Sequence, residues 1–196
     1  RRFLCLAREP VSAMPTVAIV GGGPAGLSAG LFTAKNGLDT HVFDTDETWM
    51  HKAHLFNYLG IDSMDGSEFM TEVRDQVDEF GVERHQTEVT SVSADGDEFT
   101  VETDDEEYAA DYLVLATGAD RGLAEDLGCA FDGDTVDVDL GMETSVADAY
   151  ATGAMVRDQE WQAIISAGDG GAAALDILSK EEGEHFHDFD TPADAE

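Results

Sequence analysis

The chain is poor in basic residues and cysteines, and it has no long apolar run. Lysine and arginine together number 10 against 43 aspartates and glutamates, so the 196 residues carry a formal net charge of −33. A surface of this sign repels nucleic acid phosphates and anionic membranes. No apolar run is long enough to span a bilayer. These shortages argue against a nucleic-acid-binding protein and against a membrane-spanning one.

The two cysteines, Cys5 and Cys129, lie far apart and form no C-x-x-C pair. A redox dithiol motif and a cysteine metal site are therefore not visible, and we expect a cytoplasmic protein without a bound metal. His185 and His187 stand beside carboxylates, but two histidines without a packed second shell make a poor site. We interpret them as part of a solvated tail.

The acidity has two interpretations. A device that captures a basic partner concentrates its acids in blocks, whereas here they are spread along the whole chain. Dispersed acids with scarce lysine are typical of a protein adapted to multimolar salt, in which self-repulsion is screened. We favour this halophilic interpretation.

The length suits one core-bearing domain, with or without a small appendage. Residues 1–13 hold the one basic patch, and we expect them to be an extension with little part in the fold. Residues 14–180 are expected to form a single domain. Residues 181–196 are charged and weakly apolar, which predicts a disordered tail.

A glycine-rich segment follows the first apolar run. Thr16–Val20 reads as a buried strand, and Gly21-Gly-Gly-Pro-Ala-Gly26 then leads into a helix. In such a motif Gly21 allows a tight turn, Gly23 lets the backbone approach a pyrophosphate, and Gly26 lets the helix pack on the strand. Pro24 suits the first helical turn. The segment predicts a dinucleotide-binding β-α-β unit.

The second strand, Thr40–Phe43, ends at Asp44. An acid at this position accepts hydrogen bonds from a ribose hydroxyl and repels a 2′-phosphate, so FAD or NAD is favoured over NADP. The alternative is that Asp44 only begins a polar loop with Asp46 and Glu47.

Further elements follow from periodicity and turn residues. We expect a helix from the N-cap Ser67 to Phe80, a hairpin that turns at 94–97, a strand buried on both faces at 113–115, and a long helix over 161–180. Residues 119–136 suit a surface connection. Within the last helix, we expect its glycines to allow close approach to a sheet or cofactor, with burial of Ile164, Ile165, Ala172, Leu175 and Leu178. Together these elements predict a three-layer α/β, Rossmann-like domain with a β-meander.

Several separated motifs together resemble the thioredoxin reductase-like flavoproteins of the pyridine nucleotide-disulfide oxidoreductase superfamily. They are the glycine loop at 17–30, Asn57-Tyr-Leu-Gly60, the strand ending in Ala-Thr-Gly at 111–118, and the closing segment at 142–163. The resemblance implies an FAD domain. With the glycine motif, it implies these cofactor-binding residues: Gly21, Gly23, Pro24, Ala25, Gly26, Asp44, Thr117, Gly118, Gly153, Gln162 and Ala163.

The sequence departs from the family pattern in three places. The family has an NADPH domain with a redox C-x-x-C where this chain has only residues 119–141, so that domain is expected to be absent. Gly153-Ala154 stands where the family has Gly-Asp. Other residues replace the family's Gly-Gly-Gln turn, and His51 and His54 are either substitutes for it or ordinary loop histidines.

The resemblance implies an FAD-binding oxidoreductase that takes electrons from a partner protein or a diffusible donor. No residue is identified as a catalytic acid or base, and a homodimer is a further expectation. The main alternative is a non-catalytic nucleotide-binding or interaction module. A third, an NAD-binding reductase, fits Asp44 but not the closing motifs.

Overall fold

The computed structural model describes residues 14–96 and 98–191. Its centre is a parallel five-stranded sheet with the order β12-β9-β1-β2-β5. The strands are β1 (Thr16–Val20), β2 (Asp39–Phe43), β5 (Glu83–His85), β9 (Tyr112–Leu115) and β12 (Ala149–Ala151).

Apolar side chains alternate between the two faces of this sheet. Val17 and Ile19 of β1 point into one core, whereas Ala18 and Val20 point into the other. Strand β9 does the same and is buried on both sides. Such continuous apolar strands are expected when both faces of a parallel sheet are covered.

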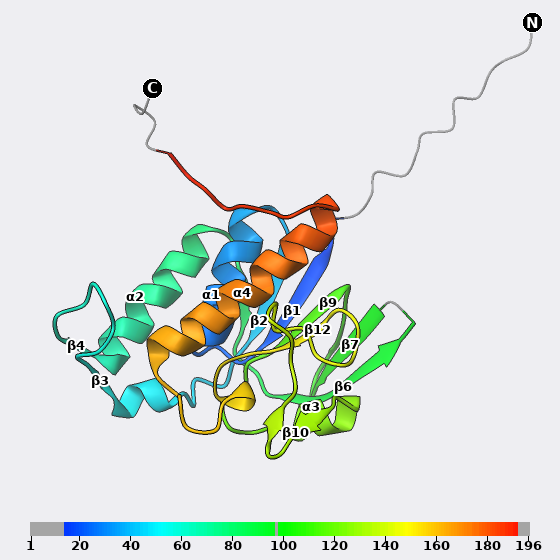
Figure 1. Cartoon of the computed structure of the whole chain (residues 1–196), viewed down its shortest axis with the longest axis horizontal. Helices are drawn as coiled ribbons and strands as arrows, with labels where there is room; N and C mark the ends of the chain where they lie inside the picture. Colours follow the sequence, from blue (N-terminus) through cyan, green and yellow to red (C-terminus); the bar gives the residue numbers. More distant parts are fainter. Residues whose placement is uncertain (1–13, 97, 192–196) are drawn as a thin grey trace, which may run out of the picture.

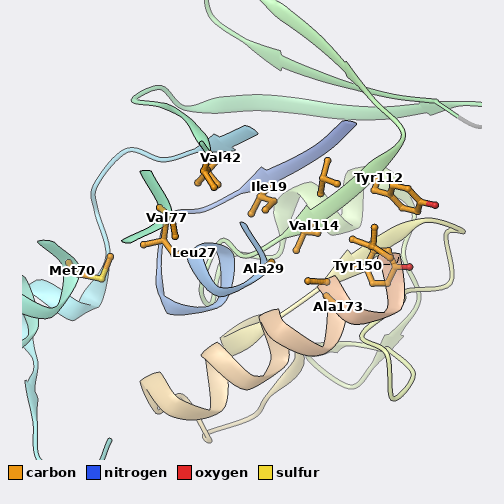
Figure 2. Packing of buried hydrophobic residues seen from close by; sticks show 14 of the residues in the cluster. Ile19, Leu27, Ala29, Val42, Met70, Val77, Tyr112, Val114, Tyr150 and Ala173 are labelled. Carbon is orange, nitrogen blue, oxygen red and sulfur yellow. The ribbon is translucent and has the colours of Figure 1, made fainter. Parts of the chain in front are cut away.

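Three helices cover the first face, namely α1 (Pro24–Lys35), α2 (Gly66–Glu79) and α4 (Ala163–Glu182) (Figure 1). Figure 2 shows Ile19 and Val114 of the sheet packed with Ala29 of α1 and Ala173 of α4. An antiparallel meander and a short helix cover the second face: β6 (Val89–Asp95), β7 (Glu98–Thr103), β8 (Glu107–Ala110) and α3 (Gly122–Leu127). The predicted three-layer α/β fold with a β-meander is confirmed.

Short elements complete the chain. They are η1 (Trp49–Lys52), β3 (His54–Leu55), β4 (Met64–Asp65), β10 (Phe131–Asp132), β11 (Thr135–Val136) and η2 (Gly153–Val156).

Two predictions around α2 were wrong. The N-cap is Asp65, whose carboxylate accepts a hydrogen bond from the Ser67 N–H at 2.9 Å, so the helix begins before the predicted cap. The last helical residue is Glu79 and Phe80 is the C-cap, so the helix also ends one residue before the predicted end.

Residues 119–136 are more than a surface connection. They contain α3 and the β10–β11 hairpin, and two of their own residues, Ala124 and Cys129, are buried in the second core. Gly128 ends α3 in the left-handed conformation. The segment was underestimated because α3 is too short to show periodicity.

The predicted buried face of α4 is confirmed only in part. Leu178 is buried as predicted, Ile165, Ala172 and Leu175 are half-buried, and Ile164 is exposed. The fully buried face also includes Ala173, Ala174 and Ile177. A Cβ on Gly170 would lie 2.0 Å from the Ala25 oxygen, so the close approach that these glycines predicted is to α1.

Helix α4 runs to Glu182, and beyond it Lys35 of α1 pairs with Asp188. Residues 1–13 and 192–196 lie outside the described part, and the domain boundaries stay predictions. No helix within the described residues is long and apolar enough to cross a membrane.

Candidate functional site

A cleft of about 740 Å³ lies at the carboxyl ends of β1, β9 and β12. Its walls come from the residues that follow each strand: Gly21–Ala25 after β1, Ala116–Gly118 after β9, and Thr152–Ala154 after β12. Open parallel sheets bind ligands at this edge, because the loops after the strands leave a crevice there.

Glycine stands at positions 21, 23 and 26 of the first loop for different physical reasons. Gly21 has φ +115°, and a Cβ there would lie 2.2 Å from the Ala116 oxygen. A Cβ on Gly26 would lie 1.9 Å from the Gly21 oxygen, which is how closely α1 packs on the loop. At Gly23 a Cβ would meet only the Thr48 hydroxyl, at 3.6 Å. The fold therefore requires glycine at positions 21 and 26. At position 23 it does not, and the missing side chain leaves space for a ligand in the cleft.

Two helices begin at this cleft without side-chain caps. The N-caps Gly23 of α1 and Gln162 of α4 make no capping hydrogen bond, and neither first turn contains an acid. Helix α2, by contrast, has Asp65 as a cap and Glu68 in its first turn. Unsatisfied N–H groups and the helix dipole favour an anion at both ends that meet the cleft.

Asp44 lies at the rim of the cleft, and its carboxylate already accepts two hydrogen bonds within the protein. Its Oδ2 accepts a hydrogen bond from the Arg74 guanidinium of α2 at 2.9 Å, and its Oδ1 accepts one from the Asp46 N–H at 3.0 Å. A carboxylate has about four lone-pair sites, so two remain available for a ligand. The Nε of Arg74 is buried without a hydrogen-bond partner.

A network beside Asp44 holds this loop. Asp46 pairs with Arg74 and with His51, and these two partners hold the pKa of the Asp46 carboxyl below its usual range. His51 also contacts the Ser67 hydroxyl, and His54 contacts that of Ser63. Neither histidine lines the cleft: His51 lies in η1 and His54 in β3.

Arg121 fixes the opposite wall. Its guanidinium donates to the carbonyl oxygens of Met155 at 2.9 Å and Ala154 at 3.0 Å, which ties the start of α3 to η2. Gly153, the first residue of η2, has φ +69°, and a Cβ there would lie 3.2 Å from that of Ala25. The turn after β12 is thus held close to the start of α1.

Two tryptophans lie at the mouth of the cleft. Trp49 and Trp161 both line it, with ring centroids 5.4 Å apart, and both are exposed. They provide an apolar surface next to the first residue of α4.

All predicted cofactor-binding residues line this cleft except Gly26 and Gln162. Gly26 lies behind the loop, and Gln162 is the exposed N-cap of α4. Sequence reasoning missed Trp49, Trp161, Arg74 and Arg121. The tryptophans gave a weak signal as large aromatics in polar loops, whereas the two arginines act through contacts distant in sequence.

The model of the pyridine nucleotide-disulphide oxidoreductase family matches residues 15–121 and 54–171 of the chain. Thioredoxin reductase of Listeria monocytogenes is 33% identical over 109 residues, which is 54% of this chain and 34% of that protein. The Mycolicibacterium smegmatis enzyme is 30% identical over 161 residues, covering 80% of this chain and 48% of that one. The chain therefore spans about a third to a half of the length of these relatives.

Solved structures agree on the fold. A thioredoxin reductase from Gloeobacter violaceus superposes with a TM-score of 0.82 at 20% identity, covering 90% of this chain and 99% of that one. A ferredoxin-flavin thioredoxin reductase from Clostridium acetobutylicum gives 0.77 at 17% identity, covering 87% and 99%.

Proposed function

The chain belongs to the pyridine nucleotide-disulphide oxidoreductase family, and we propose that its cleft binds FAD for electron transfer. One observation carries the proposal: two uncapped helix N-termini without acids meet at a glycine loop with room for a ligand. On a chain of net charge −33, the absence of acids from both first turns favours a bound anion.

Each end of the cofactor has a place in this proposal. Gly23 and the first turn of α1 would hold the pyrophosphate, and Asp44 would accept hydrogen bonds from the ribose of the adenosine half. Trp49, Gly153 and Ala163, which all line the cleft, would border the flavin ring. When bound, the flavin supplies the redox chemistry, and the N-terminus of α4 stabilises negative charge near it.

We also propose that electrons arrive from outside this chain. Between β9 and β12 the structure contains only α3, the β10–β11 hairpin and the loops around them. The buried Cys129 has no C-x-x-C partner, and burial raises the pKa of its thiol, which disfavours a reactive thiolate. The Clostridium acetobutylicum neighbour is described as a ferredoxin-flavin enzyme, which supports a one-electron donor protein as one candidate source.

The absorbance spectrum of the purified protein in high salt, before and after incubation with FAD, tests the proposal. We expect flavin bands near ~370 and ~450 nm that remain after gel filtration and bleach with a reduced donor protein or a diffusible reductant. A colourless protein that retains no added FAD contradicts it.

A non-catalytic nucleotide-binding module is the second candidate. The observation that favours it is Ala154, which is 9% exposed and stands where the family's acid would contact the cofactor. Losing a charge-assisted hydrogen bond costs about 1.5–3 kcal/mol of binding free energy. For a non-catalytic module, bound FAD should resist reduction by every donor protein. For the third alternative, an NAD-binding reductase, NAD should bind more tightly than FAD.

A further inference from the structure

A cluster of possible metal ligands lies on β2 and β5, at the edge of the central sheet. His41 pairs in register with Glu83, and Phe43 pairs with His85. Parallel pairing therefore places His41 of β2 beside both Glu83 and His85 of β5. One donor atom from each of His41, Glu83 and His85 lies within 4.8 Å of the other two.

The separations suit a tetrahedral ion. Nδ1 of His41 lies 3.0 Å from Nε2 of His85 and 3.6 Å from a carboxylate oxygen of Glu83. Zinc bonds of 2.0–2.2 Å at tetrahedral angles place neighbouring ligand atoms about 3.3–3.5 Å apart. The two observed distances lie on either side of this value, and the donor atoms of His85 and Glu83 lie within 4.8 Å of each other. Side-chain rotations would bring the three ligand atoms to one ion.

The surroundings of the cluster favour ligation by these atoms. Asp39 has a carboxylate oxygen 3.4 Å from Nε2 of His41, which favours a proton there and leaves Nδ1 free. Metal-binding histidines commonly donate their second N–H to a carboxylate in this way. The ring of Phe43 stacks on His85 with centroids 4.8 Å apart and fixes its orientation.

Both imidazoles lie partly beneath the meander, near Tyr108 of β8. The centroid of the Tyr108 ring lies 6.3 Å from that of His41 and 5.0 Å from that of His85.

We propose that His41, His85 and Glu83 bind a dication of the Zn²⁺ class, with water in the fourth position. Two imidazoles and one carboxylate suit zinc and its transition-metal neighbours, whereas magnesium and calcium prefer oxygen ligands. The sequence predicted no such site, because His41 and His85 are distant in sequence and no short motif joins them. The competing explanation is a simple hydrogen bond between the two rings.

Calorimetric titration of the chain with ZnCl₂, in high salt and excess MgCl₂, tests this site. Magnesium occupies the many surface carboxylates and leaves imidazole sites free. We expect one Zn²⁺ per chain, and at least about tenfold weaker binding in Glu83→Gln and His41→Gln, since even indirect support of a zinc ligand is worth about tenfold or more. The Glu83 side chain is 65% exposed, so its variant is expected to fold.

The matched control is the double variant His185→Gln, His187→Gln, which removes two histidines outside the cluster. We expect it to bind Zn²⁺ as tightly as the unaltered chain. Loss of binding in this control, unchanged affinity in Glu83→Gln, or absence of binding by the unaltered chain overturns the proposal. The hydrogen-bond explanation predicts the last of these outcomes.

Discussion

The Asp44 carboxylate accepts hydrogen bonds within the protein and has lone pairs left for the proposed ligand. One oxygen accepts from Arg74 and the other from the Asp46 N–H, so the side chain is oriented before a cofactor arrives. Orienting a binding group in advance lowers the entropy cost of binding. Asp44 therefore combines a structural contact to α2 with the proposed ribose contact.

Asp44→Asn is expected to weaken FAD binding about 10–100-fold, since a hydrogen bond to a charged group contributes about 1.5–3 kcal/mol. Asp46→Asn is the matched control, because Asp46 also pairs with Arg74 but does not line the cleft. Fluorescence titration with FAD measures both. Equal effects from the two variants would argue against a ribose contact at Asp44.

His85 predicts a pH dependence of stability. Burial, then the charge of His41, lower its pKa below the ordinary 6.5, while Glu83 and Glu106 oppose the shift. As pH falls below about 6.5, the unfolded chain binds the proton before the folded one, so the free energy of unfolding decreases through this range.

Urea unfolding at a series of pH values, with a chelator present, measures this effect. The His85→Gln variant should show a smaller decrease than the unaltered chain between about pH 6.5 and the lower folded pKa. Parallel curves for the two proteins would contradict the assignment to His85.

At the scale of elements, the close contact between α1 and α4 depends on Gly170 more than on the other glycines of α4. A Cβ on Gly170 would meet the backbone of Ala25, whereas one on Gly168 would meet nothing within 4 Å. Both helices begin at the cleft, so their separation also sets the geometry of the proposed phosphate and flavin positions.

Gly170→Val is expected to lower the free energy of unfolding by at least about 1–3 kcal/mol, because the helices must move apart. Gly168→Ala should instead raise it by up to about 1 kcal/mol, the difference in helix propensity. Chemical denaturation measures both changes. A loss of stability in Gly168→Ala similar to that in Gly170→Val would show that the close contact is not the cause.

Sequence reasoning worked where a single element carries its own pattern. The β1 strand, the glycine loop and the 94–97 turn combine periodicity with residues that suit their conformations, and Gly96 indeed has φ +67°. Helix α3 was missed because six residues are too few for periodicity. Arg74 beside Asp44 and His41 beside His85 depend on elements brought together only by folding, so local patterns gave no sign of them.

For the whole molecule, charge repulsion is the dominant long-range term. The chain carries a net charge of −33, and in the described residues Lys35, Arg74, Arg84, Arg157 and Lys180 each pair with an acid. With 10 basic residues against 43 acids, most acids cannot each have a basic partner of their own. The Debye length falls from about 10 Å at 0.1 M salt to about 3 Å at 1 M, which removes most of this repulsion.

The free energy of unfolding is accordingly expected to rise steadily from 0.1 M to multimolar KCl. Thermal unfolding followed by circular dichroism measures the rise, and sucrose at matched osmolality is the control for effects unrelated to charge. Equal stabilisation by sucrose and KCl, or a decrease in KCl, would contradict the halophilic interpretation.

The central claim is that FAD binds against the glycine loop, and calorimetric titration of Gly23→Val beside the unaltered chain tests it most directly. A Cβ at Gly23 would meet only the Thr48 hydroxyl within 4 Å, so the variant should fold with a loss of at most about 1–2 kcal/mol from its poorer N-cap. We expect the unaltered chain to bind one FAD and the folded variant to bind none. Equal FAD affinity in the two proteins, or no FAD binding by the unaltered chain, would contradict the account.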